Sequence, residues 1–522
     1  MLFLLIYKNS SSTSTNRCAE RLFQQRGDEN KPPLNTTRMS TDLKKETPTR
    51  MKDIMAYSAG DGVTSVLLNS ILNFAMLFYT QVIGLDATLA GLAISISIFW
   101  DAITDPIMGH ISDNTRSRWG KRHPYMLLGG ILSLFFFTLL WLVPDGMESE
   151  YAIFAWLMGF NLLMRTGMTI FLVPYNALGF EICTDYDGRS KIQGVRFAFG
   201  MAINILTAFS WVLFFPDNAD GEIKATAEAG NYTSLIIACV VVGLLLLAIV
   251  MFATRKYAID SRNESRDNGG IANMFKEIAH TLKDPLLRMV YIMTIVGITS
   301  AAFVGSVQIY VYEFFMEFTS VEKTIVHSST MVAFAVGSLV GSALAKRIEK
   351  KGAILAGISL GLIGNILLCI LFVGGIVSKD FAPFELFGME SSGGMLTFMG
   401  FHDLFWLGVG TMIPTSFAMV ADVSEIGKIR TGKLRDGSYS AMLSFVFKAS
   451  QSLGVFFSGF VLTQMGFEAA QESYSMETME KVTMVGFLSA AIFAAIAIIP
   501  VLKYPITRKY LERIRAGEIT DI

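Results

Sequence analysis

Charged residues are scarce in this sequence of 522 amino acids, and neither sign predominates. Asp, Glu, Lys and Arg make up 17% of the chain, whereas about 25% is usual in a soluble domain. The 43 basic and 44 acidic side chains almost cancel, so no net field would attract a nucleic acid. Apolar residues, in contrast, reach 52%. This composition argues against a soluble enzyme, a disordered scaffold and a nucleic-acid-binding protein.

Cysteine and histidine are also rare. The five histidines are dispersed with no His-x-x-x-His pair. The four cysteines have no Cys-x-x-Cys spacing, which excludes a disulfide scaffold and a zinc ribbon; they are Cys18, Cys183, Cys239 and Cys369. We therefore expect neither an enzyme nor a protein with a bound cofactor.

Long apolar runs are what the sequence does contain. A helix needs about 20 apolar residues to cross the hydrocarbon core of a membrane. The runs lie near residues 55–79, 88–112, 123–143, 151–176, 193–215, 232–253, 286–312, 324–346, 352–374, 396–420, 441–463 and 482–502. The sequence therefore predicts an all-α, polytopic membrane protein with twelve transmembrane helices.

The charges between the runs predict the orientation of the helices. Lys and Arg gather in the loops after the second, fourth, sixth, eighth and tenth runs, whereas the opposite loops carry only four lysines. Those four are Lys224, Lys323, Lys379 and Lys481. Basic residues accumulate on the cytoplasmic side of a membrane. We therefore expect both termini in the cytoplasm, and a multi-pass protein of a cell membrane such as the bacterial inner membrane.

The longest polar break between the runs divides them six and six, an arrangement that recurs in transporters. We predict two six-helix bundles at residues 51–253 and 286–503, a cytoplasmic central loop at 254–285 and a cytoplasmic tail at 504–522. Residues 1–50 are rich in Ser, Thr, Asn and Pro, so we expect a disordered tail. Met39 is an alternative start. The expected oligomeric state is a monomer.

A few ionisable side chains lie inside the apolar runs, where most such groups face a cavity or a partner. Asp101 and Asp105 are four residues apart, so both carboxylates lie on one face of a helix. Asp101 is about 21 Å from the start of its run, at 1.5 Å per residue. Two close carboxylates need a compensating cation. The pair could therefore hold a proton or a sodium ion; alternatively, it caps neighbouring helices or pairs with Arg and Lys.

Three basic side chains supply the opposite charge. Arg165 lies in the middle of the fourth run, Arg196 near the start of the fifth and Lys448 in the eleventh. The fork of an arginine binds carboxylate, sulfate or phosphate through two contacts, so Arg165 is a candidate for binding an anionic substrate. The alternative is an internal salt bridge, for which Asp61 in the first run is a candidate. For Arg196 and Lys448 we favour a functional role.

Three motifs carry a resemblance to a known family. Trp100–Gly109 reads WDAITDPIMG and leads into the basic loop Thr115–Lys121, Val173–Leu178 reads VPYNAL, and Met419–Asp422 reads MVAD. The sequence resembles the glycoside–pentoside–hexuronide:cation symporters (melibiose permease-like) of the major facilitator superfamily over about residues 50–510. The resemblance implies the major facilitator fold, with two six-helix halves.

The resemblance also implies roles for individual residues. The cation-binding residues would be Asp101, Asp105, Thr169 and Thr104, the two aspartates being the metal ligands if the cation is sodium. The resemblance implies a role at the sugar site for Arg196 and Lys448, and the full set of predicted substrate-binding residues is Arg196, Lys448, Arg165, Asn176, Asp61 and Ser65. The loop after the second run, with Asp113, Arg116, Arg118 and Lys121, resembles the gating motif of the family, whose charges can bridge the two halves.

The chain departs from the family at two positions. Family members that bind galactosides have carboxylates on the first and fourth helices; here these positions are Ser65, with Asp61 one turn earlier, and Leu172. Arg165 is an added base. Losing acids and gaining a base predicts an anionic substrate, such as a uronic acid.

These observations predict a symporter in the lipid bilayer that imports a sugar or glycoside with sodium or protons by alternating access. An alternative with the same fold is a carrier of lysolipids or amphiphilic compounds. An intramembrane aspartyl protease is disfavoured, because its two aspartates typically lie on separate helices, whereas Asp101 and Asp105 share one helix face. A sensor that binds a ligand without transporting it is a further alternative.

Overall fold

The computed structural model describes residues 50–182, 186–217, 224–258, 282, 284–386, 389–431, 436–471 and 474–518. The tail predicted for residues 1–50 lies outside these residues except for Arg50. Most of the predicted central loop, residues 259–281 and 283, lies outside them as well.

The first half of the chain forms six helical passes. The first pass joins α1 (Met51–Ser70), the π-turn η3 (Ile71–Ala75) and α2 (Met76–Gln81), and the fifth joins α6 (Tyr186–Ala208) and α7 (Ser210–Phe214). The others are α3 (Ala87–Asp113), α4 (His123–Trp141), α5 (Glu150–Ile182) and α8 (Ala229–Thr254), with the short turns η4 (Ala225–Ala227) and η5 (Arg255–Tyr257) flanking α8.

The second half of the chain is also helical. It contains α10 (Pro285–Tyr310) with η6 (Val311–Phe315), α11 (Ser320–Leu368) with η7 (Cys369–Val373), α12 (Gly393–Thr431), α13 (Asp436–Gln464), α14 (Met476–Lys503) and α15 (Arg508–Arg515). The expectation of an all-α chain misses one small element. Strands β1 (Pro383–Leu386) and β2 (Met389–Ser392) form an antiparallel hairpin before α12.

Eleven helical stretches of the described residues are long and apolar enough to cross a membrane. One of them, Ser320–Val373, has 54 residues, far more than the roughly 20 that one crossing needs. Its backbone leaves the helical conformation at Ile348 and at Glu349, where φ is +66°. The stretch therefore makes two crossings joined by a kink, which confirms the prediction of twelve transmembrane passes.

Local sequence signals explain where several helices begin. The carboxylate of Asp86 accepts hydrogen bonds from the backbone of Thr88 and Leu89 at the start of α3. Asp284 does the same for α10, whose first residue is Pro285. Such caps satisfy backbone N–H groups that have no partner within the helix, and proline is favoured at the first helical position because it lacks that N–H group. The caps therefore determine where α3 and α10 begin.

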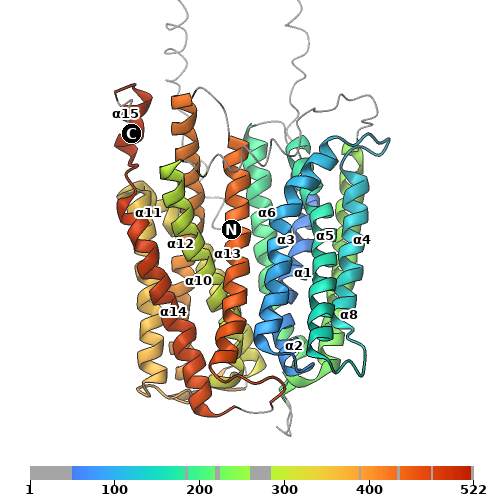
Figure 1. The fold of residues 1–522 in the computed structure, drawn as a ribbon, viewed down its shortest axis with the longest axis vertical. Helices are drawn as coiled ribbons and strands as arrows, with labels where there is room; N and C mark the ends of the chain where they lie inside the picture. Colours follow the sequence, from blue (N-terminus) through green and yellow to red (C-terminus); the bar gives the residue numbers. More distant parts are fainter. Residues whose placement is uncertain are drawn as a thin grey trace, which may run out of the picture. The chain divides into compact units, whose positions relative to one another are not determined.

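The helices of the two halves of the chain gather in two groups (Figure 1). Helices α1, α3, α4, α5, α6 and α8 lie on one side of the view, and α10 to α14 lie on the other. We call the end of the bundle that carries α15 the α15 end, and the end that carries η4, η6 and the β-hairpin the hairpin end. Ser391 of the hairpin donates a hydrogen bond of 2.6 Å to Glu322 near the start of α11.

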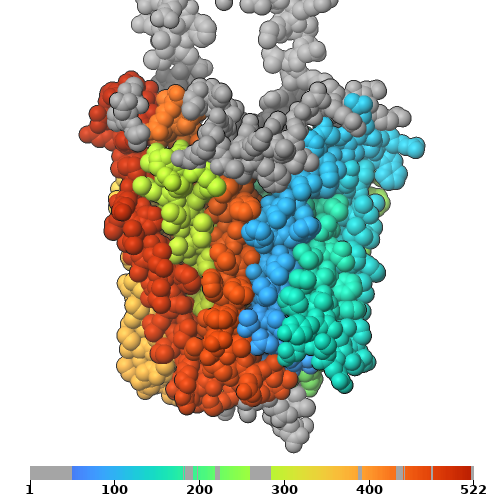
Figure 2. Space-filling view, viewed as in Figure 1, coloured from blue at the N-terminus to red at the C-terminus, as the bar shows by residue number. Residues whose placement is uncertain are grey.

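The two groups meet along α3 and α13, which lie side by side in blue and orange in Figure 2. Thr88 bonds Thr463 at 2.9 Å near the hairpin end, and further along Ser95 bonds Ser452 at 2.8 Å. Gly459 lies between these contacts on α13. A Cβ atom added to it would lie only 2.1 Å from the carbonyl oxygen of Ala87 at the start of α3. Glycine is therefore required at this position for the two helices to approach so closely.

Candidate functional site

Arg196 lies at the centre of a polar network between α1, α5 and α6. Its Nε and one terminal nitrogen donate to the two carboxylate oxygens of Asp61, both at 2.7 Å. The same terminal nitrogen contacts Asn176 Oδ1 at 2.6 Å, and the hydroxyl of Tyr175 donates to Asp61 at 2.8 Å. The guanidinium carbon also lies 4.9 Å from the centre of the Tyr175 ring. Two-point contacts of this kind fix the orientation of a guanidinium group.

This network lines a cavity of about 500 Å³, which we call the polar cavity. Its walls are formed by Asp61, Ser65, Gln193, Arg196, Gly200, Met201 and Asn204. The structure therefore brings together four of the predicted substrate-binding residues, because Asp61, Ser65 and Arg196 line the cavity and Asn176 binds Arg196. Gln193 and Asn204 were not predicted, since neutral amides in or near apolar runs do not stand out as charged residues do.

Asp105 lies at the contact between the two halves. Its carboxylate accepts a hydrogen bond of 2.9 Å from Thr169 on α5 and pairs with the ammonium group of Lys448 on α13. Thr104 and Thr169 have their hydroxyl oxygens 3.3 Å apart, and Thr104 also donates to the backbone oxygen of Trp100. The residues that the sequence assigned to a cation site are therefore clustered, with a lysine of the other half in direct contact.

Asp101 binds Arg165. Arg165 on α5 donates to Asp101 at 2.7 Å, and the two side chains are only 4% and 12% exposed. The proposed pairing of Arg165 with Asp61 was wrong, because Asp61 binds Arg196 instead. The expectation that Arg165 binds an anionic substrate also loses its basis, since its charge is already matched by a buried carboxylate.

The predicted gating loop forms a different set of contacts from those expected. Arg122 pairs with Asp113 at 2.6 Å and with Glu181 at 3.1 Å. Arg116 and Arg118 are exposed. Arg122 also donates a hydrogen bond of 2.9 Å to Ser112. All three of these partners belong to the first half of the chain, so this cluster links α3 with the end of α5 and does not bridge the halves here. No role was predicted for Arg122 or Glu181 from the sequence.

A second cavity, of about 260 Å³, lies between the two halves, and we call it the central cavity. Its polar lining consists mainly of amides with one histidine and one tryptophan: Asn69, Asn73, Asn204, Gln308, Gln451, His327 and Trp406. Gln308 Oε1 accepts a hydrogen bond from the Trp406 indole at 3.1 Å. The polar and central cavities share Asn204, so they adjoin.

A third cavity, of about 850 Å³, opens on the second half, and we call it the vestibule. It extends from Lys448 to Glu425 and Lys428, which lie near the end of α12. Most of its wall is apolar and includes Phe417, Val420, Leu443 and Phe447. Since Glu425 binds Arg515 of α15 at 2.7 Å, the vestibule reaches the α15 end.

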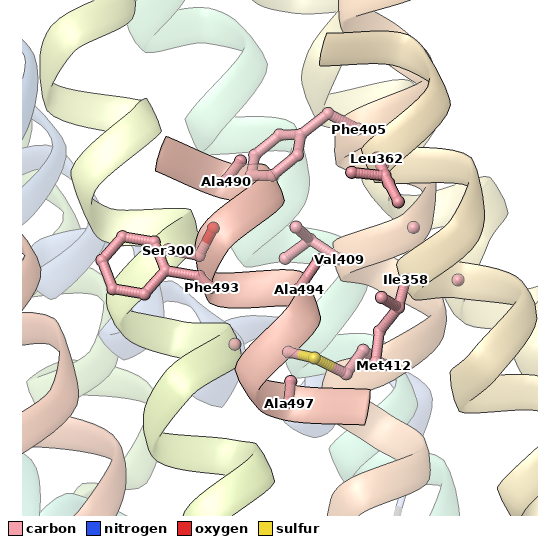
Figure 3. Close-up of a pocket in the computed structure, with 14 residues that line it drawn as sticks. Ser300, Ile358, Leu362, Phe405, Val409, Met412, Ala490, Phe493, Ala494 and Ala497 are labelled. Atoms are coloured by element: carbon pink, nitrogen blue, oxygen red, sulfur yellow. The ribbon is translucent and has the colours of Figure 1, made fainter. Parts of the chain in front are cut away.

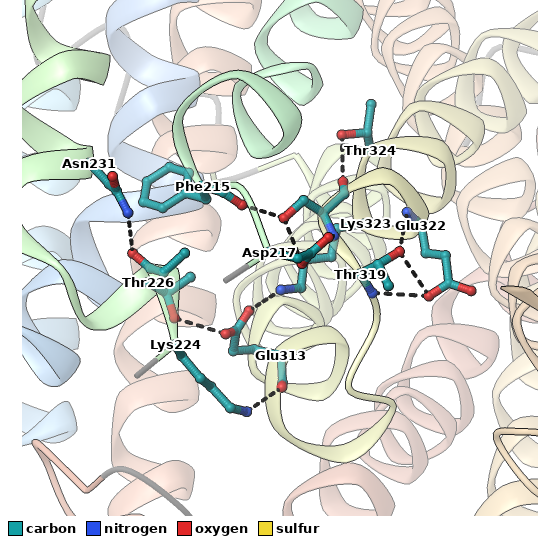
Figure 4. Close-up of polar contacts among 12 residues, drawn as sticks. Phe215, Asp217, Lys224, Thr226, Asn231, Glu313, Thr319, Glu322, Lys323 and Thr324 are labelled. Atoms are coloured by element: carbon teal, nitrogen blue, oxygen red, sulfur yellow. Dashed lines mark hydrogen bonds and ion pairs between the residues drawn. The ribbon is translucent and has the colours of Figure 1, made fainter. Parts of the chain in front are cut away.

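The hairpin end is closed by contacts between the halves (Figure 4). Glu313 of η6 pairs with Lys323 at 2.5 Å and accepts a hydrogen bond of 2.8 Å from Thr226, while Lys224 donates to the Glu313 backbone oxygen at 2.8 Å. Asp217 accepts from the backbone N–H of Ser320 at 3.0 Å. Burial lowers the pKa of Lys224, and the charge of Glu313 acts in the opposite direction.

A further small cavity lies within the second half (Figure 3). It measures about 50 Å³, and Ser300 is the one polar side chain among the residues that line it. Since one water molecule occupies roughly 30 Å³ in the liquid, this cavity is too small for a sugar. Phe405, Phe493 and Met412 are among the apolar residues that line it.

Comparison with known proteins identifies relatives over most of the chain. The family described as MFS/sugar transport protein matches residues 56–508. The Inner membrane symporter YicJ of Escherichia coli is 26% identical over 443 residues, which cover 82% of this chain and 86% of that protein. The Glucuronide carrier protein homolog of the same organism is 22% identical, with 89% and 94% covered. The Isoprimeverose transporter of Lactiplantibacillus pentosus is 23% identical, with 84% and 86% covered.

Solved structures agree in fold. The nucleoside transporter NupG superposes with a TM-score of 0.60 at 12% identity, covering 87% of this chain and 100% of that chain. A partially occluded inward open conformation of the xylose transporter XylE from Escherichia coli has a TM-score of 0.53 at 11% identity, with 85% and 98% covered. At such identities the likeness concerns the fold alone.

Proposed function

Because the chain belongs to the MFS/sugar transport family, whose description matches residues 56–508, we propose that it is a secondary symporter that imports a sugar or a glycoside with a sodium ion or a proton. Like its relatives, it is a membrane transporter and not an enzyme. The finer assignments below, of substrate site, coupling site and alternating access, are part of the proposal.

The observation that carries the proposal is a single face of α5. Arg165, Thr169 and Asn176 are spaced by four and seven residues, so they lie on one face of the helix. They bind Asp101, Asp105 and Arg196, respectively. About 16 Å of helix therefore connects the proposed cation site with the polar cavity. A shift of α5 that follows occupation of one site therefore changes the contacts of α5 at the other site.

The polar cavity has the chemistry needed for a sugar. Hydroxyl groups both donate and accept, and Arg196, Gln193 and Asn204 provide donors while Asp61 and the amide oxygens accept. Asp61 holds the guanidinium group in place, so little side-chain freedom is lost when a ligand binds. The Arg196 charge is balanced by Asp61, and this favours an uncharged sugar or glycoside over the anionic substrate expected from the sequence.

In the proposed cycle, the pair between Asp105 and Lys448 is the element that changes. An entering cation takes the place of the Lys448 ammonium group at Asp105, and this frees α13 from α3. The two halves then rock about the central cavity. The cation and the sugar must raise each other's affinity by the same factor, because linkage is reciprocal.

We place the α15 end in the cytoplasm and the hairpin end outside, in accordance with the basic loops, so that both termini are cytoplasmic. In this orientation the contacts of Glu313 with Thr226 and Lys224 close the outside, and the vestibule leads inward. The structure then corresponds to an inward-open state of a protein that we place, as a monomer, in the bacterial inner membrane.

The proposal is tested by uptake of a labelled sugar panel into vesicles that contain the purified protein. Arg196→Lys keeps the charge but loses the two-point contact with Asp61, so we expect uptake to fall severely. Asp145→Asn, which changes an exposed loop carboxylate, is the matched control and should transport normally. Equal uptake by the Arg196→Lys protein and the wild type would reject the polar cavity as the sugar site.

The vestibule favours a second candidate function. Its apolar wall of Phe417, Val420, Leu443 and Phe447 ends at Lys448 on one side and Lys428 on the other, which suits an amphiphile with an anionic head group. A lysolipid carrier with this fold would show uptake that lysophosphatidate blocks and simple sugars do not. Competition by sugars alone would support the sugar symporter.

A further inference from the structure

Arg165 is held in a buried ion pair within the first half. Its guanidinium group binds Asp101 at 2.7 Å, and its side chain is 4% exposed. Both residues belong to the first half, Asp101 on α3 and Arg165 on α5. The same two helices also contact each other through Asp105 and Thr169. Rocking of the halves therefore leaves this pair intact, whereas it separates Asp105 from Lys448 on α13.

The residues present do not fit a sodium ion held by both aspartates. A hard cation is bound by several oxygen atoms at once. Asp101 Oδ2 binds Arg165, and the two oxygens of Asp105 bind Thr169 and Lys448. Among the described residues, Asp101 Oδ1 is a buried oxygen without a hydrogen-bond donor. A single carboxylate oxygen of this kind is a poor sodium site, and it lies beside a fixed positive charge.

The charges lead to the same conclusion. Asp101 and Asp105 contribute two negative charges, and Arg165 and Lys448 contribute two positive ones. The cluster is therefore already neutral, and an added sodium ion would leave an uncompensated charge in a medium of low dielectric constant, which is costly. Release of Lys448 would correct the balance at Asp105, but Arg165 would still occupy Asp101.

We propose that Arg165 is a built-in cation that takes the place of sodium at Asp101, so that this chain binds no sodium ion at the aspartate pair and its uptake does not require sodium. The claim that uptake does not require sodium rests on the proposed symport function. The claim that no sodium ion binds at the aspartate pair does not rest on it. Arg165 is in this view the residue that determines which cation the site accepts. It contacts the site and not the sugar.

The test compares the wild type, Arg165→Gln and the control Arg347→Gln, which changes an exposed arginine of α11. The first readout is the melting temperature of the purified protein in sodium chloride and in potassium chloride. The second is sugar uptake into vesicles in the same two salts. Arg165→Gln leaves the negative charge of Asp101 uncompensated, and we expect this variant to gain a sodium-specific rise in melting temperature and sodium-stimulated uptake.

For the wild type and Arg347→Gln we expect the same melting temperature in both salts, and uptake that differs by less than about twofold, a negligible free energy. A sodium-specific rise in the wild-type melting temperature would overturn the proposal, as would a folded Arg165→Gln protein without one. If Arg165→Gln does not fold, Arg165→Lys is used, which keeps the charge and should remain insensitive to sodium; a sodium response would again overturn the proposal.

Failure of the symport function would give a different result. If the wild type takes up no sugar in either salt while Arg165→Gln still gains the sodium-specific rise in melting temperature, the proposed function fails and the assignment of Arg165 holds. If the wild type takes up sugar and is stimulated severalfold by sodium, the symport function holds and the assignment of Arg165 fails.

Discussion

At the scale of single residues, the ionisable groups of the membrane region could be found from the sequence, but their pairing could not. Asp61, Asp101, Asp105, Arg165 and Lys448 are conspicuous in apolar runs. Which acid meets which base depends on how the helices pack, and three acids and several bases on different helices leave several pairings open. The amides of the central cavity were missed because an uncharged Asn or Gln is tolerated in many transmembrane positions.

The Arg196 pair leads to a prediction about affinity. Asp61→Asn keeps the shape of the side chain but removes the charge that orients Arg196 through two contacts of 2.7 Å. A hydrogen bond to a charged group contributes about 1.5–3 kcal/mol, so we expect the KM for sugar to rise about tenfold or more. The measurement is initial uptake at several sugar concentrations, with Asp145→Asn as the control. An unchanged KM would contradict the proposed role of Asp61.

Asp105 leads to a prediction about coupling. Asp105→Asn removes the charge that Lys448 and Thr169 contact, so an entering cation has no site from which to displace Lys448. We expect the variant to exchange sugar across vesicles without accumulating it against a gradient. Counterflow of labelled sugar measures the exchange, and imposed cation gradients measure accumulation. Full accumulation by this variant would exclude Asp105 as the coupling residue.

At the scale of elements, the twelve apolar runs were sufficient to predict the transmembrane helices, because burial in lipid requires every backbone group to be bonded within the helix. The hairpin β1–β2 was not predicted, since its two short strands mix apolar and polar residues and lie between runs. The kink at Glu349 could not be predicted from the sequence either. A non-glycine residue with φ of +66° is uncommon, and no local motif marks it.

The close approach of α3 and α13 leads to a prediction about conformation. A side chain at Gly459 would meet the Ala87 carbonyl at 2.1 Å, so Gly459→Val should prevent the hairpin end from closing. We expect cysteines placed in the central cavity to react with a reagent applied from the outside, as they would in an outward-open protein. Gly159→Val is the matched control, because a Cβ atom there meets nothing within 4 Å. Equal labelling in both variants would argue against the contact as a gate.

At the scale of the whole molecule, the basic loops and the motif WDAITDPIMG predicted the fold class and the family, and the match over residues 56–508 confirms both. The conformational state could not be predicted, because one sequence must support both inward-open and outward-open arrangements. The contacts that close the hairpin end, of Glu313 with Thr226 and of Asp217 with Ser320, therefore carry no signature in the sequence beyond their positions near the ends of apolar runs.

These contacts lead to a prediction about the equilibrium between states. Glu313→Gln removes the charge that strengthens the hydrogen bond donated by Thr226 across the two halves, and a hydrogen bond to a charged group contributes about 1.5–3 kcal/mol. We expect the population to shift toward opening of the hairpin end, measured by distances between spin labels on η4 and η6. Glu477→Gln, which breaks an exposed pair with Lys481, is the control and should change nothing measurable. Identical distance distributions in the two variants would contradict the gate.

The central claim, that the chain couples sugar entry to a cation through Asp105, is tested most directly by concentrative uptake. Vesicles that contain the purified protein receive a labelled sugar under separately imposed sodium and proton gradients. We predict that the wild type accumulates the sugar above its outside concentration under one of the gradients and that Asp105→Asn only equilibrates it. Equilibration without accumulation by the wild type under both gradients would contradict symport.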